Sequence, residues 1–139
     1  MMVVDASVWI DYFNGRLTPE TDTLDALLGQ QILIVGDITL TEVLQGFRND
    51  ADFRKARALL ESLEFREMLG RKVAIESARN YRALRTEGVT VRKTIDVMIA
   101  TFCLLHDYSL LHADCDFDPI ERYLGLRVVD SRLGYRPSP

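Results

Sequence analysis

The chain has no apolar run that approaches the roughly 18 residues of a membrane span, which excludes an integral membrane protein and predicts no membrane partner. Its two cysteines, Cys103 and Cys115, are too few for a disulfide framework. The N-terminus lacks the charged region and the small-residue cleavage site of a signal peptide. Together these absences predict a cytoplasmic protein.

What is present is the composition of an ordinary globular protein. Of the 139 residues, 47% are hydrophobic and 27% are charged. This length is typical of one domain with a sizeable core, and no linker, repeat or low-complexity segment divides it. We therefore predict a single domain over residues 1–139.

The charge is unevenly distributed, although the net charge of −4 argues against a simple nucleic-acid-binding protein. Residues 48–93 contain 12 Lys and Arg against 7 Asp and Glu, whereas the rest of the chain contains 5 against 14. This asymmetry suits a protein that holds a metal at one place and an anionic polymer beside it. Solvated helix faces with charges of both signs would explain it equally well.

Short apolar segments between helical patterns indicate the fold class. Strands are expected at residues 3–5, 32–35, 109–111 and 126–129. Parallel strands that are buried on both faces have such continuous apolar runs, and helices connect them. The prediction is an α/β fold whose parallel sheet is covered by helices on both faces, with sites at the carboxyl ends of the strands.

Capping residues and apolar periodicity predict the helices. Residues 6–13 and 75–84 are expected to be helical, and the nearly all-apolar residues 95–105 predict a central buried helix. A short helix should begin at residues 118–119. Caps are predicted at Thr18, at Thr39 or Thr41, and at Asp50 or Asp52.

Four carboxylates stand out because they lie far apart in the chain, each beside a strand or helix pattern: Asp5, Glu42, Asp96 and Asp114. An ionised carboxylate in an apolar stretch is costly unless a cation or metal accompanies it. Hard oxygen ligands suit Mg²⁺ or Mn²⁺. If the fold brings these acids together, they form a divalent-metal site that can activate water against a phosphodiester.

Four motifs, in this order and spacing, closely resemble those of the PIN-domain ribonucleases, and in particular the VapC toxins of toxin–antitoxin pairs. They are residues 3–10 (VVDASVWI), 40–43 (LTEV), 90–96 (TVRKTID) and 110–117 (LLHADCDF). The resemblance covers nearly the whole chain. It implies a PIN-like three-layer α/β/α sandwich with a central, mainly parallel sheet.

The resemblance also implies roles for individual residues. The catalytic and metal-binding acids would be Asp5, Glu42, Asp96 and Asp114, with Asp116 as an additional metal ligand. Ser7 would support a carboxylate or a water, and Arg92 would pair with a site carboxylate or meet a phosphate. His112 stands where many members of the family have Thr.

Structural explanations compete with several of these roles. Asp5 precedes a helix and can serve as its N-cap, with one oxygen on the backbone and the other facing a metal. Arg92 lies four residues before Asp96 and can be its ion-pair partner on a helix. Asp116 and Asp118 can stabilise the N-terminus of the next helix.

Two further patterns have alternative explanations. Cys103 and His106, with His112 and Cys115, have the ligand types of a zinc site, but Cys103 lies in a nearly all-apolar helix where free cysteine packs as a small hydrophobe. The aromatic residues 9, 12 and 13 suggest base stacking, although core or dimer packing is the more common use of such a cluster.

The resemblance predicts a Mg²⁺-dependent endoribonuclease toxin that hydrolyses RNA with a metal-activated water. Its partners would be RNA, a cognate antitoxin protein and a second copy in a homodimer, and the basic residues 48–93 would hold RNA phosphates. One alternative is a catalytically weak module that binds antitoxin and nucleic acid. Another is a receiver-like phosphoacceptor built on Asp37, which is disfavoured because no Lys follows Lys93.

Overall fold

Within residues 1–131, which the computed structural model describes, four short parallel strands form the centre of the molecule. They are β1 (Met2–Val4), β2 (Leu33–Gly36), β3 (Glu64–Arg66) and β4 (Ser109–Leu111), in the order β3-β2-β1-β4. Residues 132–139, which the predicted single domain includes, lie outside the described residues.

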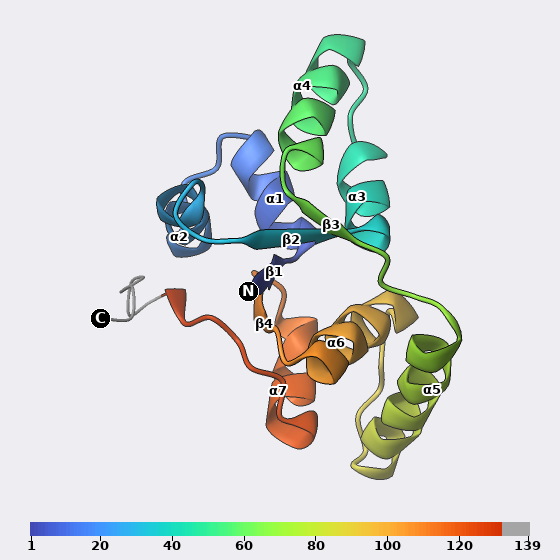
Figure 1. Cartoon of the computed structure of the whole chain (residues 1–139). Helices are drawn as coiled ribbons and strands as arrows, with labels where there is room; N and C mark the ends of the chain where they lie inside the picture. Colours follow the sequence, from blue (N-terminus) through green and yellow to red (C-terminus); the bar gives the residue numbers. More distant parts are fainter. Residues whose placement is uncertain (132–139) are drawn as a thin grey trace.

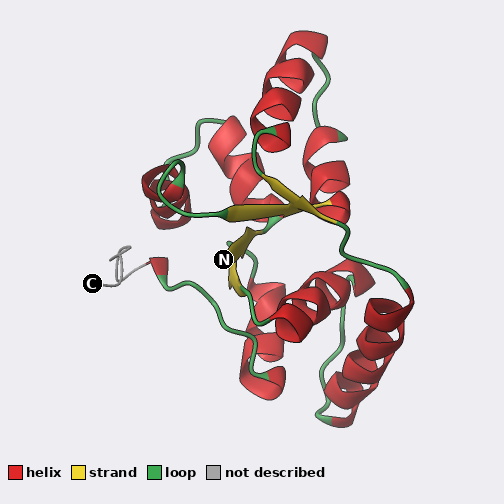
Figure 2. Ribbon diagram, in the orientation of Figure 1, coloured by secondary structure: helices red, strands yellow, loops and turns green. Residues whose placement is uncertain are grey.

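Helices cover both faces of this sheet (Figure 1). They are α1 (Ala6–Phe13), α2 (Pro19–Leu27), α3 (Asp37–Leu44), α4 (Asp50–Glu61), α5 (Arg71–Thr86), α6 (Thr94–His106) and α7 (Asp118–Leu124), with a 3-10 turn, η1 (Cys115–Phe117). Helices α1 to α4 lie on one side and α5 to α7 on the other (Figure 2). The three-layer α/β/α prediction is therefore confirmed.

Two hydrophobic cores follow from the alternation of side chains along the strands. Successive residues of a strand point to opposite faces, and in β1 both faces are apolar. Met2 and Val4 pack with Trp9 and Leu24 on the face of α1 and α2. Val3 packs with Phe102 and other residues of α6 on the opposite face. Burial on both faces explains why the strands read as unbroken apolar runs.

Several local predictions are confirmed. Thr18 caps α2, where its Oγ1 accepts a hydrogen bond of 3.0 Å from the Thr21 backbone N–H. Helix α6 is the expected central helix, and seven of its residues are buried. Trp9 is fully buried and stacks on Phe13 with ring centroids 5.8 Å apart, so this cluster belongs to the core and not to a base-stacking surface.

Two of the predicted caps are wrong. Helix α3 begins directly after Gly36, and Thr39, predicted as a cap together with Thr41, is fully buried in its interior. Helix α4 is capped by Asn49, whose Oδ1 accepts from the N–H groups of Ala51 and Asp52. Helix α3 starts directly at the end of β2, where no polar side chain precedes it, and the cap of α4 lies one residue before the earlier predicted cap, Asp50.

The sheet also differs from the prediction at its two edges. Strand β3 was not expected, because its charged and half-exposed residues suit an edge strand and have no apolar pattern. Conversely, the strand predicted at residues 126–129 is reduced to a single parallel bridge between Val128 and Leu110. Backbone hydrogen bonds still hold that segment beside β4.

Candidate metal centre

The four predicted acids come from four separate elements that meet at the carboxyl ends of β1 and β4. Asp5 follows β1, Asp114 lies shortly after β4, Glu42 is on α3 and Asp96 is in the first turn of α6. The charges of Asp5, Asp96 and Asp114 each raise the pKa of Glu42. The fold therefore brings all four carboxylates together, as the sequence predicted.

Asp5 is held rigidly, as the N-cap of α1. Its Oδ2 accepts hydrogen bonds from the backbone N–H and from the hydroxyl of Ser7, at 3.0 and 2.6 Å. The Ser7 hydroxyl oxygen in turn accepts from the N–H of Ala113, at 3.1 Å, and so links the end of β1 to the loop after β4. The N-cap of α1 therefore uses Asp5 Oδ2, which accepts from the Ser7 N–H. This agrees with the prediction that one carboxylate oxygen caps the helix.

Glu42 and Asp96 contain the two side-chain oxygens that most need a cation. Glu42 Oε1 and Asp96 Oδ2 are buried and have no hydrogen-bond partner. Burial, and then the charge of Asp5, raises the pKa of Glu42 to about 7. Burial also raises the pKa of Asp96 to about 6, although the Lys93 ammonium opposes the shift. Buried carboxylate oxygens that accept no hydrogen bond are costly, so both positions favour a nearby cation.

Lys93 supplies positive charge to this cluster, a role that the sequence analysis missed. Its Nζ donates to Asp114 Oδ2 at 3.0 Å and forms an ion pair with Asp96 Oδ2, 3.5 Å away. The hydrogen bond to Asp114 raises the pKa of Lys93 above its usual value. Burial alone would raise the pKa of Asp114, but the hydrogen bonds from the Asp116 N–H and from Lys93 lower it.

Arg92 does not pair with Asp96 as predicted. Helix α6 begins at Thr94, so Arg92 precedes it and is not one turn below Asp96. No ion pair among the described residues involves Arg92, which is exposed and lines a cavity of about 80 Å³ together with Lys93 and Asp96. Side chains four residues apart face each other only inside a helix. Here Lys93, three residues before Asp96, forms the ion pair instead.

Asp116 lies beside the cluster and lines the same cavity as Asp96. Among residues 1–131, ligand atoms of Asp114, Cys115 and Asp116 approach within 4.8 Å of one another, closely enough to share an ion. Asp114 Oδ1 also accepts a hydrogen bond of 2.9 Å from the Asp116 N–H. The local turn thus orients both carboxylates toward the start of α6.

The zinc alternative is not supported in the described part of the chain. The Cys103 thiol is fully buried, and burial raises its pKa to about 12. His106 Nδ1 is occupied by the carbonyl oxygen of Phe102 at 2.9 Å. Neither residue belongs to a group of ligands close enough to share an ion.

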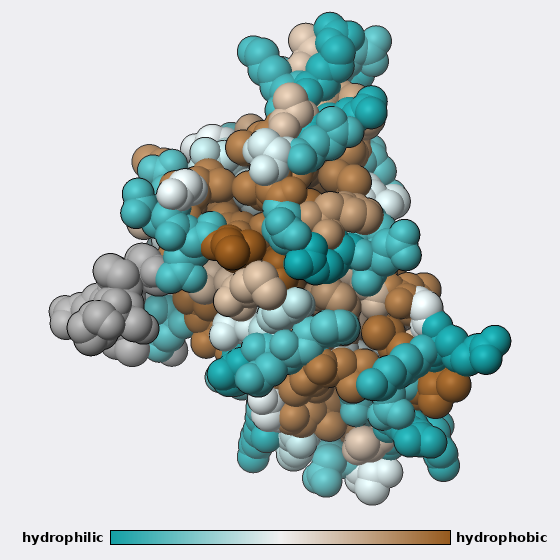
Figure 3. Space-filling view, viewed as in Figure 1, coloured by the Kyte–Doolittle hydropathy of each residue, from teal (hydrophilic) through white to brown (hydrophobic). Residues whose placement is uncertain are grey.

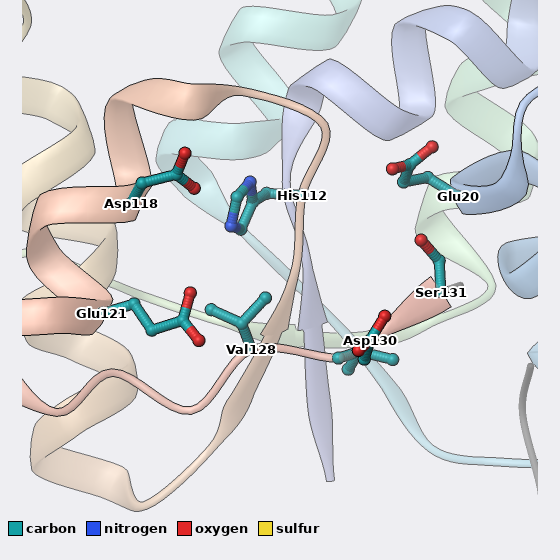
Figure 4. A pocket seen from close by; sticks show the side chains of 8 residues that line it. Glu20, His112, Asp118, Glu121, Val128, Asp130 and Ser131 are labelled. Carbon is teal, nitrogen blue, oxygen red and sulfur yellow. The ribbon is translucent and has the colours of Figure 1, made fainter. Parts of the chain in front are cut away.

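His112 faces a separate cavity of about 390 Å³ (Figure 4). Its ring lies against Phe117, with centroids 4.9 Å apart, and its Nδ1 accepts from the Asp114 N–H. In the figure, Asp118 of α7 and Glu20 of α2 lie on opposite sides of the ring. None of the four central acids lines this cavity, so His112 supports the Asp114 backbone from outside the centre.

Asp37 has a structural role, which argues against the receiver-like alternative. Its Oδ1 accepts hydrogen bonds from the backbone N–H groups of Ile38 and Met68, at 3.0 and 2.9 Å. This carboxylate therefore joins the start of α3 to the segment between β3 and α5.

We expect Ser7→Ala to lower the free energy of unfolding by about 1–2 kcal/mol, because it removes a hydrogen bond to a buried carboxylate and a bond to Ala113. Urea denaturation measures the loss. Ser62→Ala is the matched control, because its hydroxyl also donates one short hydrogen bond, but to the backbone carbonyl of Leu59 at an exposed position. Equal losses in the two variants would contradict the linking role of Ser7.

The donor set fits a hard divalent cation. It consists of carboxylate oxygens, two of which are buried and unpartnered, with a further acid pair at residues 114 and 116. Asp5, Glu42, Asp96, Asp114 and Asp116 are the residues that can hold such an ion. The acidic cluster can therefore bind a divalent metal.

Comparison with known proteins agrees with the motif order and the fold. The ribonuclease VapC11 of Mycobacterium tuberculosis (strain ATCC 25618 / H37Rv) is 28% identical over 137 residues, which cover 95% of this chain and 100% of VapC11. VapBC2 of Rickettsia felis, bound to a promoter DNA fragment, has a TM-score of 0.73 at 14% identity and covers 92% of this chain and 96% of its own.

A toxin–antitoxin complex from Klebsiella pneumoniae has a TM-score of 0.71 at 22% identity and covers 94% of this chain and 98% of its own. The family model that describes the PIN domain matches residues 2–123. The matched residues include all five acids of the centre and all four strands of the sheet. The match shows that this chain belongs to the PIN domain family.

Proposed function

We propose that this protein is a metal-dependent endoribonuclease that acts as the toxin of a toxin–antitoxin pair, and that residues 1–139 form a single PIN domain. The observation that supports it best is the convergence of four carboxylates from four elements, with two buried oxygens that accept no hydrogen bond within residues 1–131. The relative of matching length is named a ribonuclease, and the similar structures are described as toxin–antitoxin assemblies.

The chain's own residues prepare the centre for this chemistry. Asp5, Glu42, Asp96 and Asp114 would hold Mg²⁺, or Mn²⁺ in its place, and Asp116 would complete the acid set. When bound, the ion activates water against the scissile phosphodiester and offsets charge on the leaving oxygen. Ser7 fixes the orientation of Asp5 through its two bonds to Oδ2. No side chain needs to act as a covalent nucleophile.

Lys93 has two candidate partners in this proposal. Its side chain is 51% exposed, so the ammonium can leave the carboxylates without a large change in packing. Once a metal neutralises Asp96 and Asp114, the same ammonium is placed to meet a phosphate of RNA. Arg92, which lines the adjoining cavity, would support the same phosphate.

A second candidate function is a binding module that acts through an antitoxin and nucleic acid. The neighbouring structures described as complexes, one of them on promoter DNA, favour this role. A basic side chain of a partner protein would meet the carboxylates that Lys93 meets here. The homodimer stays a prediction, which light scattering of the purified chain would test. No helix among residues 1–131 is long and apolar enough to cross a membrane.

The test of the proposed function is cleavage of total cellular RNA by the purified chain, with Mg²⁺ or Mn²⁺ and with EDTA. Discrete products that require the metal support the nuclease, and end mapping then identifies the RNA. A folded chain, free of antitoxin, that binds RNA but cleaves nothing in either metal would favour the binding module.

We expect Lys93→Met to tighten Mn²⁺ binding by about tenfold, or about 1.4 kcal/mol, because the variant removes a cation that competes for Asp96 and Asp114. Isothermal titration calorimetry at pH 8 measures the affinity. Arg92→Met is the matched control and should change the affinity less, since Arg92 makes no ion pair with these acids. Weaker binding by Lys93→Met would show that Lys93 does not compete with the metal.

A further inference from the structure

A groove of about 380 Å³ runs between α5 and α6, on the side of the molecule away from α1 to α4. Its walls combine small and apolar residues with two arginines and a tyrosine: Ala74, Ser77, Ala78, Tyr81, Arg82, Arg85, Thr94 and Met98. Figure 3 shows hydrophobic and strongly hydrophilic surface side by side over α5 and α6. The groove has no role in the metal centre described above.

The charge around this groove is opposite to that of the chain as a whole. Helix α5 contains five Lys and Arg but a single acid, Glu76, whereas the whole chain has a net charge of −4. Arg82 and Arg85 line the groove, and the Arg85 guanidinium lies over the Tyr81 ring, 5.2 Å from its centroid. Nucleic-acid-binding surfaces use aromatic rings to stack bases and nearby Arg side chains to attract the backbone.

Ser77 provides an independent sign that a ligand belongs here. It is only 4% exposed, and its hydroxyl oxygen has no hydrogen-bond partner although it lines the groove. A buried hydroxyl without a partner is costly, and a ligand with a polar edge would satisfy it. The neighbouring walls of Ala74, Ala78 and Met98 would contact a flat apolar face. A nucleobase has both a flat face and a polar edge.

Neighbouring residues of the chain link the groove to the metal centre. Thr94 lines the groove, and its neighbour Lys93 donates to Asp114 inside the acid cluster. Arg92 and Lys93 line the small cavity that also contains Asp96. Arg82 and Arg85 in the groove, with Arg92 and Lys93 just before α6, place four cations on the stretch that leads to the carboxylates, and these attract an anionic polymer.

We propose that the α5–α6 groove binds one nucleotide of single-stranded RNA beside the bond that the metal centre cleaves. The base lies against Tyr81 and Met98 and reaches the Ser77 hydroxyl, and the flanking phosphates contact Arg82 and Arg85. This inference rests on the proposed ribonuclease function and names the surface by which it selects its substrate. Binding in this groove favours an unpaired base, because a base inside a duplex cannot be inserted.

The test is fluorescence anisotropy with a fluorescein-labelled, single-stranded RNA of about 12 nucleotides in EDTA, because the proposed cleavage requires a divalent metal. We expect Arg82→Gln with Arg85→Gln to weaken binding at least about tenfold and to reduce the salt slope by about 1.4, because two phosphate contacts are lost. Ala78→Phe, at an exposed position, fills the groove without a change of charge and should also weaken binding about tenfold.

The charge-matched control is Lys72→Gln with Arg79→Gln, which removes two cations from α5 outside the groove. Its affinity should fall less than about threefold, since only the general field of the helix is reduced. Equal losses in the two double variants, or no loss with Ala78→Phe, would overturn the groove proposal. Unchanged RNA affinity in every groove variant would also overturn it and assign the groove to a protein partner.

Cleavage of total RNA separates this inference from the proposed function. Metal-dependent cleavage by the wild type that is equally fast in the groove variants overturns the groove but keeps the nuclease. RNA binding that depends on the groove, without any metal-dependent cleavage, overturns the nuclease and keeps the groove as a binding surface. Circular dichroism melts of every variant confirm that the comparison is made on folded protein.

Discussion

Asp96→Asn is expected to reduce metal-dependent RNA cleavage at least about a hundredfold, because loss of a direct ligand exceeds the 10- to 100-fold effect of changes behind the ligands. Asp96 is 4% exposed, and its Oδ2 is buried without a hydrogen bond. The variant removes negative charge that raises the pKa of Glu42, so the fold should be retained or slightly stabilised. Single-turnover cleavage in saturating Mn²⁺, together with a thermal melt, measures both effects.

The matched control for this prediction is Asp52→Asn. Asp52 also lies in the first turn of a helix, α4, but it is exposed and outside the acid cluster. Its cleavage rate should equal that of the wild type. Cleavage by Asp96→Asn at the wild-type rate would show that Asp96 is not part of the metal centre. A variant that is inactive and also unfolded would show a structural role instead, and the thermal melt distinguishes the two cases.

Metal affinity should rise by about a thousandfold between pH 5 and pH 8, because an ion must displace protons from two carboxyl groups. The pKa of Glu42 is about 7 and that of Asp96 about 6, both raised chiefly by burial. Each deprotonation contributes a factor of about ten per pH unit below its pKa. Calorimetric titration with Mn²⁺ at several pH values measures the affinity and the protons released.

Glu42→Gln provides the control, since it removes the group with the higher pKa. Its weaker affinity should vary with pH by only about tenfold over the same range, which reflects Asp96 alone. An affinity of the wild type that is independent of pH would mean either that Glu42 and Asp96 are ionised at pH 5 already or that the metal binds elsewhere.

The metal-free protein should show the opposite dependence on pH. A carboxyl group whose pKa is raised by folding binds its proton more tightly in the folded state than in the unfolded chain. The contribution of Glu42 and Asp96 to stability is therefore complete below about pH 4 and is lost as the pH rises to about 7. Asp114, with its lowered pKa, acts only around and below its ordinary value of 3.8.

Thermal melts in EDTA therefore test the linkage. The Tm should fall from pH 5 to pH 8, and saturating Mn²⁺ at pH 8 should reverse the fall by mass action. Glu42→Gln should flatten the dependence in EDTA, because the side chain with the larger shift no longer titrates.

Much of this fold is encoded in local patterns. The strands at residues 32–35 and 109–111 are apolar because both faces of β2 and β4 are buried, and their residues read as unbroken runs. Thr18 and Pro19 mark the start of α2 by capping chemistry. Helix α6 is apolar nearly all round because it lies between the sheet and α5. Each of these signals is contained within a few residues.

The sequence predicted which residues belong to the candidate site, but not how their side chains contact one another. The motifs named the four acids that the fold brings together, and Ser7, predicted to support a carboxylate or a water, donates to Asp5 Oδ2. Lys93 was missed because its contact with Asp114 spans 21 residues, and no local rule distinguishes it from Arg92. The edge strand β3 was missed because its charged residues have no apolar signal.

The sequence by itself determined the order of the elements apart from the two sheet edges, the acids that are candidates for a metal site, and the buried nature of β1, β2, β4 and α6. These properties depend on periodicity, capping and burial, which act over one or two turns of chain. Only the tertiary structure decided that Lys93 faces the acids, that Glu42 and Asp96 keep unpartnered buried oxygens, and that a basic groove adjoins them. Those properties arise where elements distant in sequence pack together, and charge interactions there depend on distances that no local pattern specifies.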